Sequence, residues 1–148
     1  MITIRVATPG DAARCAELSE TLGYPSGAHD MATRLERILS RDADVVFVAV
    51  ADGGRVVGWL HGSELEMLEA GRRCEIFGLV IDAEYRRQGI GQQLVSAVER
   101  WAAGRGIEVV TVRSNTVRPE SHPFYEAQGF TRVKSQHVYR KRVGTLTP

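Results

Sequence analysis

The fold of this chain is decided by one stretch, Cys74-Glu-Ile-Phe-Gly-Leu-Val-Ile-Asp-Ala-Glu-Tyr-Arg-Arg-Gln-Gly-Ile-Gly-Gln-Gln-Leu94. It opens with a short apolar run, Ile76 to Ile81, whose length and β-branched content predict a buried strand. A polar loop follows at 82–88, and then comes Gly89-Ile90-Gly91. Apolar residues next recur every three or four positions, which predicts a helix with one apolar face that ends near Gly104. These residues are Ile90, Leu94, Val95, Val98, Trp101 and Ala102.

A glycine turn between a strand and a helix can bind an anion. The first helical turn has N–H groups without intrahelical partners and carries partial positive charge. Glycine lets a phosphate approach that backbone closely, and Arg86 and Arg87 add two cations. The pattern is neither a P-loop, since no Lys precedes position 134, nor a dinucleotide fingerprint, since the third glycine is missing. It predicts a pyrophosphate cradle, with a plain tight turn before a surface helix as the alternative.

Composition sets limits on the class of protein. The 148 residues indicate a single domain over 1–148, with 143–148 as a loose tail. A net charge of +1 does not favour nucleic-acid binding. Cys15 and Cys74 have no metal-ligand spacing with the four histidines, so no metal is expected and both thiols are interpreted as packed side chains. No leader or long apolar run is visible, which favours a cytoplasmic protein without membrane contact.

The remaining elements alternate between strands and helices. Alternation predicts a strand at 2–7, and Thr8-Pro9-Gly10-Asp11 reads as a capping box that starts a helix. A second helix is expected around 31–39, and Asp52-Gly53-Gly54 reads as the turn of a hairpin. The later strands are expected at 107–112, 130–134 and 137–142, with a helix that starts no earlier than Glu120 because of Pro123. This order predicts an α/β (α+β) fold with a mixed sheet covered on both faces.

Three segments in this order resemble the GCN5-related N-acetyltransferase (GNAT) superfamily. Residues 48–59 are similar to its central hairpin, and residues 79–91 to its Arg/Gln-x-x-Gly-x-Gly/Ala motif. The third segment, Ser114-Asn115 through Arg118 and His122 to Phe130, resembles its Asn…Phe-Tyr-x-x-x-Gly-Phe pattern. Ala83 and Arg87 depart from the Pro and Gly that the family often has there.

The resemblance implies a fold and a cosubstrate. The fold would be a mostly antiparallel sheet of about seven strands, splayed between strands four and five, with helices on both faces. The cosubstrate would be acetyl-CoA, without a metal. Backbone N–H groups of Gln88, Gly89, Gly91 and Gln92 would hold its pyrophosphate. The other coenzyme contacts implied are Leu79, Val80, Ile81, Arg86, Arg87, Ile90, Asn115 and Tyr125.

The resemblance also implies direct transfer of an acetyl group to a primary amine. Tyr125 would protonate the departing thiolate or hydrogen-bond to it; the alternative is a packed core tyrosine. Glu75 would accept the amine proton; the alternative is a strand-end carboxylate paired with Arg72 or Arg73. His122 has either a place near the coenzyme or a role at a helix start.

The acceptor is left open between a small amine, an aminoglycoside-like compound and a protein or peptide amino group. Its pocket is expected from 22–30, 67–71 and the Ser135–Gln136 tip. Glu64, Glu66 and Glu69 would attract a cation or simply be solvated. Two other functions remain as alternatives: a catalytically silent acyl-CoA sensor, and a nucleic-acid-binding module that uses the basic residues between 132 and 142. A homodimer is expected by resemblance alone.

Overall fold

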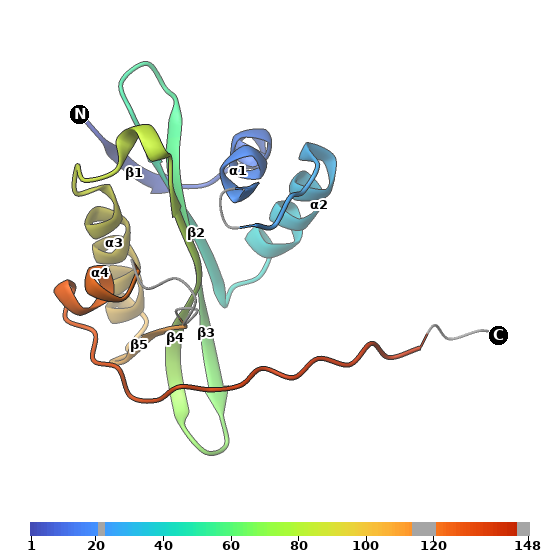
Figure 1. Cartoon of the computed structure of the whole chain (residues 1–148), viewed down its shortest axis with the longest axis vertical. Coiled ribbons are helices and arrows are strands. Elements are labelled where there is room, and N and C mark those ends of the chain that lie inside the picture. Colours follow the sequence, from blue (N-terminus) through green and yellow to red (C-terminus); the bar gives the residue numbers. More distant parts are fainter. Residues whose placement is uncertain (21–22, 114–120, 145–148) are drawn as a thin grey trace. The chain divides into compact units, whose positions relative to one another are not determined.

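The computed structural model describes residues 1–20, 23–113 and 121–144 (Figure 1). Contacts along the chain divide it into two compact units, Met1–Arg113 and Ser114–Pro148. Each unit is described by itself. The first unit contains the whole sheet and three of the α-helices.

Within the described residues, the sheet has five strands in sequence order. They are β1 (Thr3–Val6), β2 (Asp44–Val50), β3 (Val56–Met67), β4 (Gly71–Ile81) and β5 (Val110–Val112). Neighbours are antiparallel from β1 to β4, and β5 runs parallel to β4. The predicted mixed, mostly antiparallel sheet is therefore confirmed, whereas β4 begins at Gly71 and not near Ile76, because residues 71–75 continue the antiparallel pairing with β3.

Helices cover both faces of this sheet, with α1 and α2 on one side and α3 on the other (Figure 1). A 3-10 turn, η1 (Pro9–Asp11), leads into α1 (Ala12–Ser19), and α2 (Ala28–Leu39) follows. Cys15, Leu18 and Leu35 of these helices form one buried cluster with Val46, Val48 and Val80 of the sheet. On the opposite face lies α3 (Ile90–Gly104), packed so closely that a Cβ on Gly62 would stand 2.7 Å from Val98 Cγ2.

Strands β4 and β5 separate after only three paired positions. The register pairs Cys74 with Val110, Glu75 with Thr111 and Ile76 with Val112. Residues 78–81 of β4 still pair with β3, Phe77 lies at a β-bulge between the two paired stretches, and within the described residues none of 77–81 has a partner in β5. The predicted splay between the fourth and fifth strands is therefore present.

A sharp turn joins β4 to α3. Asp82 follows β4, and its side chain accepts a 3.0 Å hydrogen bond from the Glu84 N–H at the start of η3 (Ala83–Tyr85). Two residues of the turn adopt left-handed backbone conformations, Arg87 with φ 65° and Gly89 with φ 76°. This conformation costs Gly89 little energy because glycine lacks a Cβ. The same conformation strains the backbone of Arg87, which has one.

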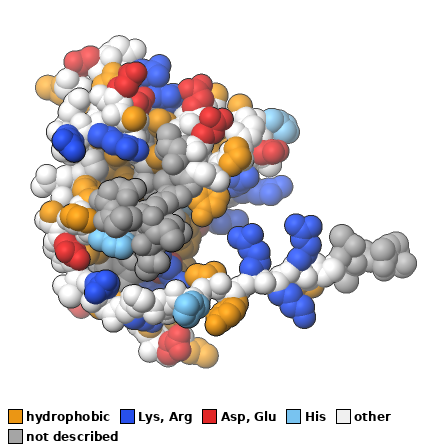
Figure 2. Space-filling view, in the orientation of Figure 1, with side chains coloured by type: hydrophobic (Ala, Val, Ile, Leu, Met, Phe, Trp, Pro, Cys, Tyr) orange, Lys and Arg blue, Asp and Glu red, His pale blue; other side chains and the backbone are white. Residues whose placement is uncertain are grey.

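The second unit contains one described helix, α4 (Ser121–Ala127), in which Pro123 occupies the first turn as predicted. Residues 130–144 form no helix or strand, and their basic and apolar side chains stand out along an extended chain (Figure 2). The strands expected at 130–134 and 137–142 are therefore wrong, and the sheet has five strands and not about seven. Alternation of apolar residues supplies a strand pattern, but a strand also requires a pairing partner, and an isolated hairpin is marginal in water. Of the expected tail at 143–148, residues 145–148 lie outside the described residues.

The capping box at the start of the first helix predicts a pH dependence of stability. Asp11 accepts hydrogen bonds from both Arg5 terminal nitrogens, at 2.8 and 3.0 Å, and from the Thr8 N–H at 2.8 Å. These donors, Arg5 foremost, hold the pKa of Asp11 below its usual range. The unfolded chain therefore takes up this proton more readily, so the contribution of Asp11 is complete above about pH 5 and is lost as pH falls through the lowered pKa.

We expect Asp11→Asn to cost about 1–2 kcal/mol of unfolding free energy at pH 7 and to flatten its decline toward pH 3, as measured by urea unfolding. The exposed Asp52, paired with the chain terminus, provides the control Asp52→Asn, which should keep the wild-type slope. Parallel pH profiles for Asp11→Asn and wild type would contradict the assignment.

Adjacent arginines allow a matched test of backbone strain in the turn. Arg86 has φ −67° and Arg87 has φ 65°, and both side chains are exposed. Arg86→Gly and Arg87→Gly remove the same charge and increase the entropy of the unfolded chain equally. Only Arg87→Gly also removes a Cβ that clashes with the backbone in the left-handed conformation. We expect Arg87→Gly to be more stable than Arg86→Gly by about 1 kcal/mol in thermal or urea unfolding. Equal stabilities would show that Arg87 is not strained.

Candidate functional site

The predicted anion cradle is open at the N-terminus of α3. The first intrahelical bond there runs from the Gln93 N–H to the Gly89 carbonyl at 3.1 Å, so the amides of residues 90–92 have no partner within the helix. Residues 86–89 are exposed, and nothing lies within 4 Å of a Cβ built on Gly89. Ile90, in contrast, is buried in the core and anchors the helix start. The backbone amides, the dipole of a 15-residue helix and two arginines therefore converge on one exposed corner.

The unpaired edge of β4 leads directly into this corner. Leu79, Val80 and Ile81 belong to the part of β4 that β5 leaves open. An extended molecule with amide groups can hydrogen-bond to such an edge as an added strand would. Two groups of the predicted coenzyme contacts, Leu79–Ile81 and Gln88–Gln92, thus lie in one continuous stretch of chain that runs from β4 through the turn into α3.

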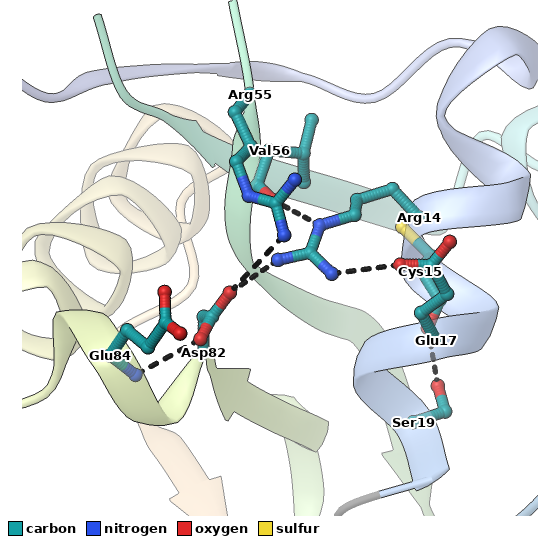
Figure 3. A network of polar contacts seen from close by, with 8 residues as sticks. All are labelled: Arg14, Cys15, Glu17, Ser19, Arg55, Val56, Asp82 and Glu84. Carbon is teal, nitrogen blue, oxygen red and sulfur yellow. Dashed lines mark hydrogen bonds and ion pairs between the residues drawn. The ribbon is translucent and has the colours of Figure 1, made fainter.

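Arg14 connects the turn after β4 to α1, the helix to which it belongs, as Figure 3 shows. This helix lies on the face of the sheet opposite α3 (Figure 1). The Nε of Arg14 donates to the Val56 carbonyl at 2.8 Å, and its guanidinium also pairs with Asp82. Arg55 lies 4.0 Å from the same carboxylate. The Glu84 N–H and the Arg14 guanidinium hold the pKa of Asp82 below its usual range, so this carboxylate is ionised at neutral pH. Sequence reasoning missed this contact, which joins residues 68 positions apart.

Glu75 lies where β4 and β5 part, and its carboxylate is already occupied. One oxygen accepts from Arg73 at 3.3 Å and from the Thr111 hydroxyl at 3.2 Å, and the other lies 3.4 Å from Arg113 Nε. Glu75 is buried, with 6% of its surface exposed. Arg73 is one of the partners named in the alternative interpretation, but Glu75 lies inside β4 and not at a strand end.

Tyr125 belongs to the second unit, on α4. Its ring contacts Phe124 and Phe130 edge-on, with centroid distances of 5.2 and 5.8 Å. Burial raises the pKa of its phenol, which is therefore protonated at neutral pH. His122 is on the same helix and is half-buried. Asn115 lies outside the described residues.

A cavity of about 220 Å³ lies between α1, α2 and the sheet, all within the first unit. Val46, His61 and Gly78 are register neighbours on β2, β3 and β4, and all three line it. Tyr24 and Ser26 also line it, from the predicted 22–30 segment, whereas residues 67–71 do not. The hypothesis that Glu64 attracts a substrate cation is not favoured, because its oxygens already bind Arg72 at 2.8 Å and Arg105 at 3.0 Å.

Two further kinds of site have no support in residues 1–20, 23–113 and 121–144. No group of three His, Cys, Asp or Glu side chains within these ranges is arranged to hold a metal ion. None of the helices there combines the length and the hydropathy needed to cross a bilayer.

Several known proteins resemble this chain in sequence and structure. An aminoglycoside N(6')-acetyltransferase type 1 from Stenotrophomonas maltophilia is 28% identical over 142 residues, which cover 93% of this chain and 92% of the relative. A solved aminoglycoside antibiotic 6'-N-acetyltransferase from Acinetobacter baumannii is 20% identical, with a TM-score of 0.85 over 97% of this chain and 100% of its own. An aminoglycoside N-acetyltransferase solved in complex with CoA is 22% identical, with a TM-score of 0.86 over 97% of this chain and 96% of its own.

The structural likeness agrees with the fold built above from strand order, splay and turn. The model of the acetyltransferase (GNAT) family matches residues 13–130, which is well over half of the chain and includes β4, the turn and α3. This chain belongs to the acetyltransferase (GNAT) family.

Proposed function

We propose that this protein transfers an acetyl group from acetyl-CoA directly to a primary amine. The observation that carries the proposal is the continuous path from the unpaired edge of β4 through the Arg87–Gly89 turn to the free amides of α3. This path suits a molecule with an extended amide-containing arm and a diphosphate, which is the chemistry of coenzyme A. A relative of this fold has been solved with CoA, which supports the same cosubstrate here.

In the proposed reaction, the neutral amine nitrogen forms a bond to the thioester carbonyl carbon, and the carbon–sulfur bond breaks. The sulfur leaves as thiolate and takes a proton, and the amine nitrogen loses one, so that the products are an amide and free CoA. We assign the protonation of sulfur to Tyr125. The raised pKa of its phenol supports this role, because an acid must hold its proton at working pH.

For Glu75, the contacts support a positioning role over the role of base. Both of its oxygens already face arginines or a hydroxyl, so few lone pairs remain for an amine proton. Its partners Thr111 and Arg113 come from β5 and the residue after it, next to the last β4–β5 pair. We infer that Glu75 holds the two strands together at the point beyond which they part.

The cradle is tested by comparing two glycines of the same helix. Gly89→Ala places a methyl group at a left-handed position in the cradle, whereas Gly104→Ala adds the same group at the other end of α3, with no atom within 4 Å. By calorimetry we expect Gly89→Ala to weaken CoA binding about tenfold or more and Gly104→Ala to leave it unchanged. Equal affinities for the two variants, or no binding heat with the wild type, would overturn the proposal. Binding by the wild type without acetyl transfer to any amine of a broad panel would identify a sensor instead.

The acid is tested by removing one hydroxyl. We expect Tyr125→Phe to lower kcat by about a hundredfold or more and to keep CoA affinity, because the thiolate loses its proton donor. The wild-type rate should fall as pH rises through the raised pKa of Tyr125, and the variant should lack that basic limb. Tyr139, which is 90% exposed in the same unit, supplies the control Tyr139→Phe. A Tyr125→Phe variant with an unchanged rate at every pH would show that the phenol has no part in catalysis.

A further inference from the structure

The cavity between α1, α2 and the sheet has a chemical character that bears on the acceptor, and the inference drawn from it rests on the proposed acetyl transfer. Its walls are mainly apolar, with Met31, Leu35 and Ile38 from α2 facing Val46, Trp59 and Phe77 from the sheet. Its volume of about 220 Å³ is smaller than the roughly 300–1,000 Å³ of sites for drug-sized ligands. The walled part of this half-open space therefore suits one ring or one short alkyl chain, and a linked series of sugar rings would extend beyond it.

The cavity lies beside the strand proposed to hold the coenzyme. Gly78 lines it, and the open segment Leu79–Ile81 follows immediately. The six-membered ring of Trp59 lies against this backbone, since a Cβ on Gly78 would stand 2.8 Å from Trp59 Cη2. A molecule in the cavity would thus be next to β4 at the point where the edge is free.

The charges around the cavity oppose a polycation. The described residues that line it include no Asp or Glu, and its ionisable members include Arg34, exposed on α2, and His61. Asp44 stands behind this wall: its side chain is 6% exposed and bonded to His61 Nε2 at 2.8 Å. One carboxylate behind one imidazole can balance a single ammonium group. Each additional ammonium would have to lose its water without a partner, which is costly.

The same walls favour the reactive form of a monoamine. Burial in an apolar space disfavours the charged form of an amine and so increases the share of the neutral nucleophile. An aromatic body would also gain edge and face contacts with Trp59 and Phe77. We infer that the acceptor is a primary monoamine with a single apolar aryl or alkyl body, bound in this cavity, and not a polycationic aminoglycoside.

Binding can be measured apart from transfer by using Trp59 as the probe. In a Trp101→Phe background Trp59 is the remaining tryptophan, so its fluorescence reports on the cavity wall. The full chain is titrated with 2-phenylethylamine, n-hexylamine and neamine, with and without CoA. We expect a saturable fluorescence change with the first two amines and none with neamine. A change with neamine alone, or with none of the three, would overturn the inference.

A matched pair of variants tests whether the cavity wall is responsible. Phe77 and Val109 are both 51% exposed, but only Phe77 is a wall residue. Phe77→Ala should weaken binding of 2-phenylethylamine roughly tenfold, and Val109→Ala should leave it unchanged. Equal effects of the two substitutions would place the amine elsewhere.

Kinetics separate this inference from the proposed function. With acetyl-CoA, kcat/KM should be at least about tenfold higher for 2-phenylethylamine than for neamine. If the cavity binds the monoamine but no amine is acetylated, the proposed function fails and the binding site stands. If neamine is the better substrate and leaves Trp59 unaffected, the transferase stands and the inference about its acceptor fails.

Discussion

The structure depends on the early parting of β4 from β5. Three paired positions hold the strands together. At these positions the Glu75 carboxylate also contacts Arg73 on its own strand and Thr111 and Arg113 on the other side, through charge-assisted bonds. Beyond these positions, residues 78–81 keep their pairing with β3, and their other edge has no partner in β5. Buried backbone groups normally find partners, so an unpaired strand edge in the middle of a sheet is a place where another molecule can pair. The glycine turn and α3 then lie at the end of this open edge.

The local parts of the site could be predicted because each depends on a few neighbouring residues. Gly89 signals a left-handed turn, and the apolar spacing after Ile90 signals the helix that it opens. Thr8 to Asp11 likewise form the capping contacts that their order suggests. The splay came from resemblance to a family, since nothing in the residues of β4 alone states where its neighbour stops.

What could not be predicted depends on contacts between distant segments. Asp44 and His61 meet because the β2–β3 register pairs Asp44 with Ser63 and Val46 with His61, which makes Asp44 and His61 diagonal neighbours on one face; a shift of one residue would place them on opposite faces. The cavity follows from the same register together with the packing of α2. The strands expected after Phe130 illustrate the opposite case, in which Val133, Val138 and Tyr139 have the right pattern but remain 84–90% exposed because no ladder forms.

Arg14 links the two halves of the proposed site through a single side chain. Its helix contributes Cys15 and Ser19 to the cavity wall, while its guanidinium meets Asp82 at the start of the coenzyme turn. Any movement of α1 that would widen the cavity must therefore also pull on the segment that orients the diphosphate. In the proposed reaction, an ion pair that touches neither reactant would therefore help to set the spacing between amine and thioester, and the stiffness of this remote contact would affect how accurately the two meet.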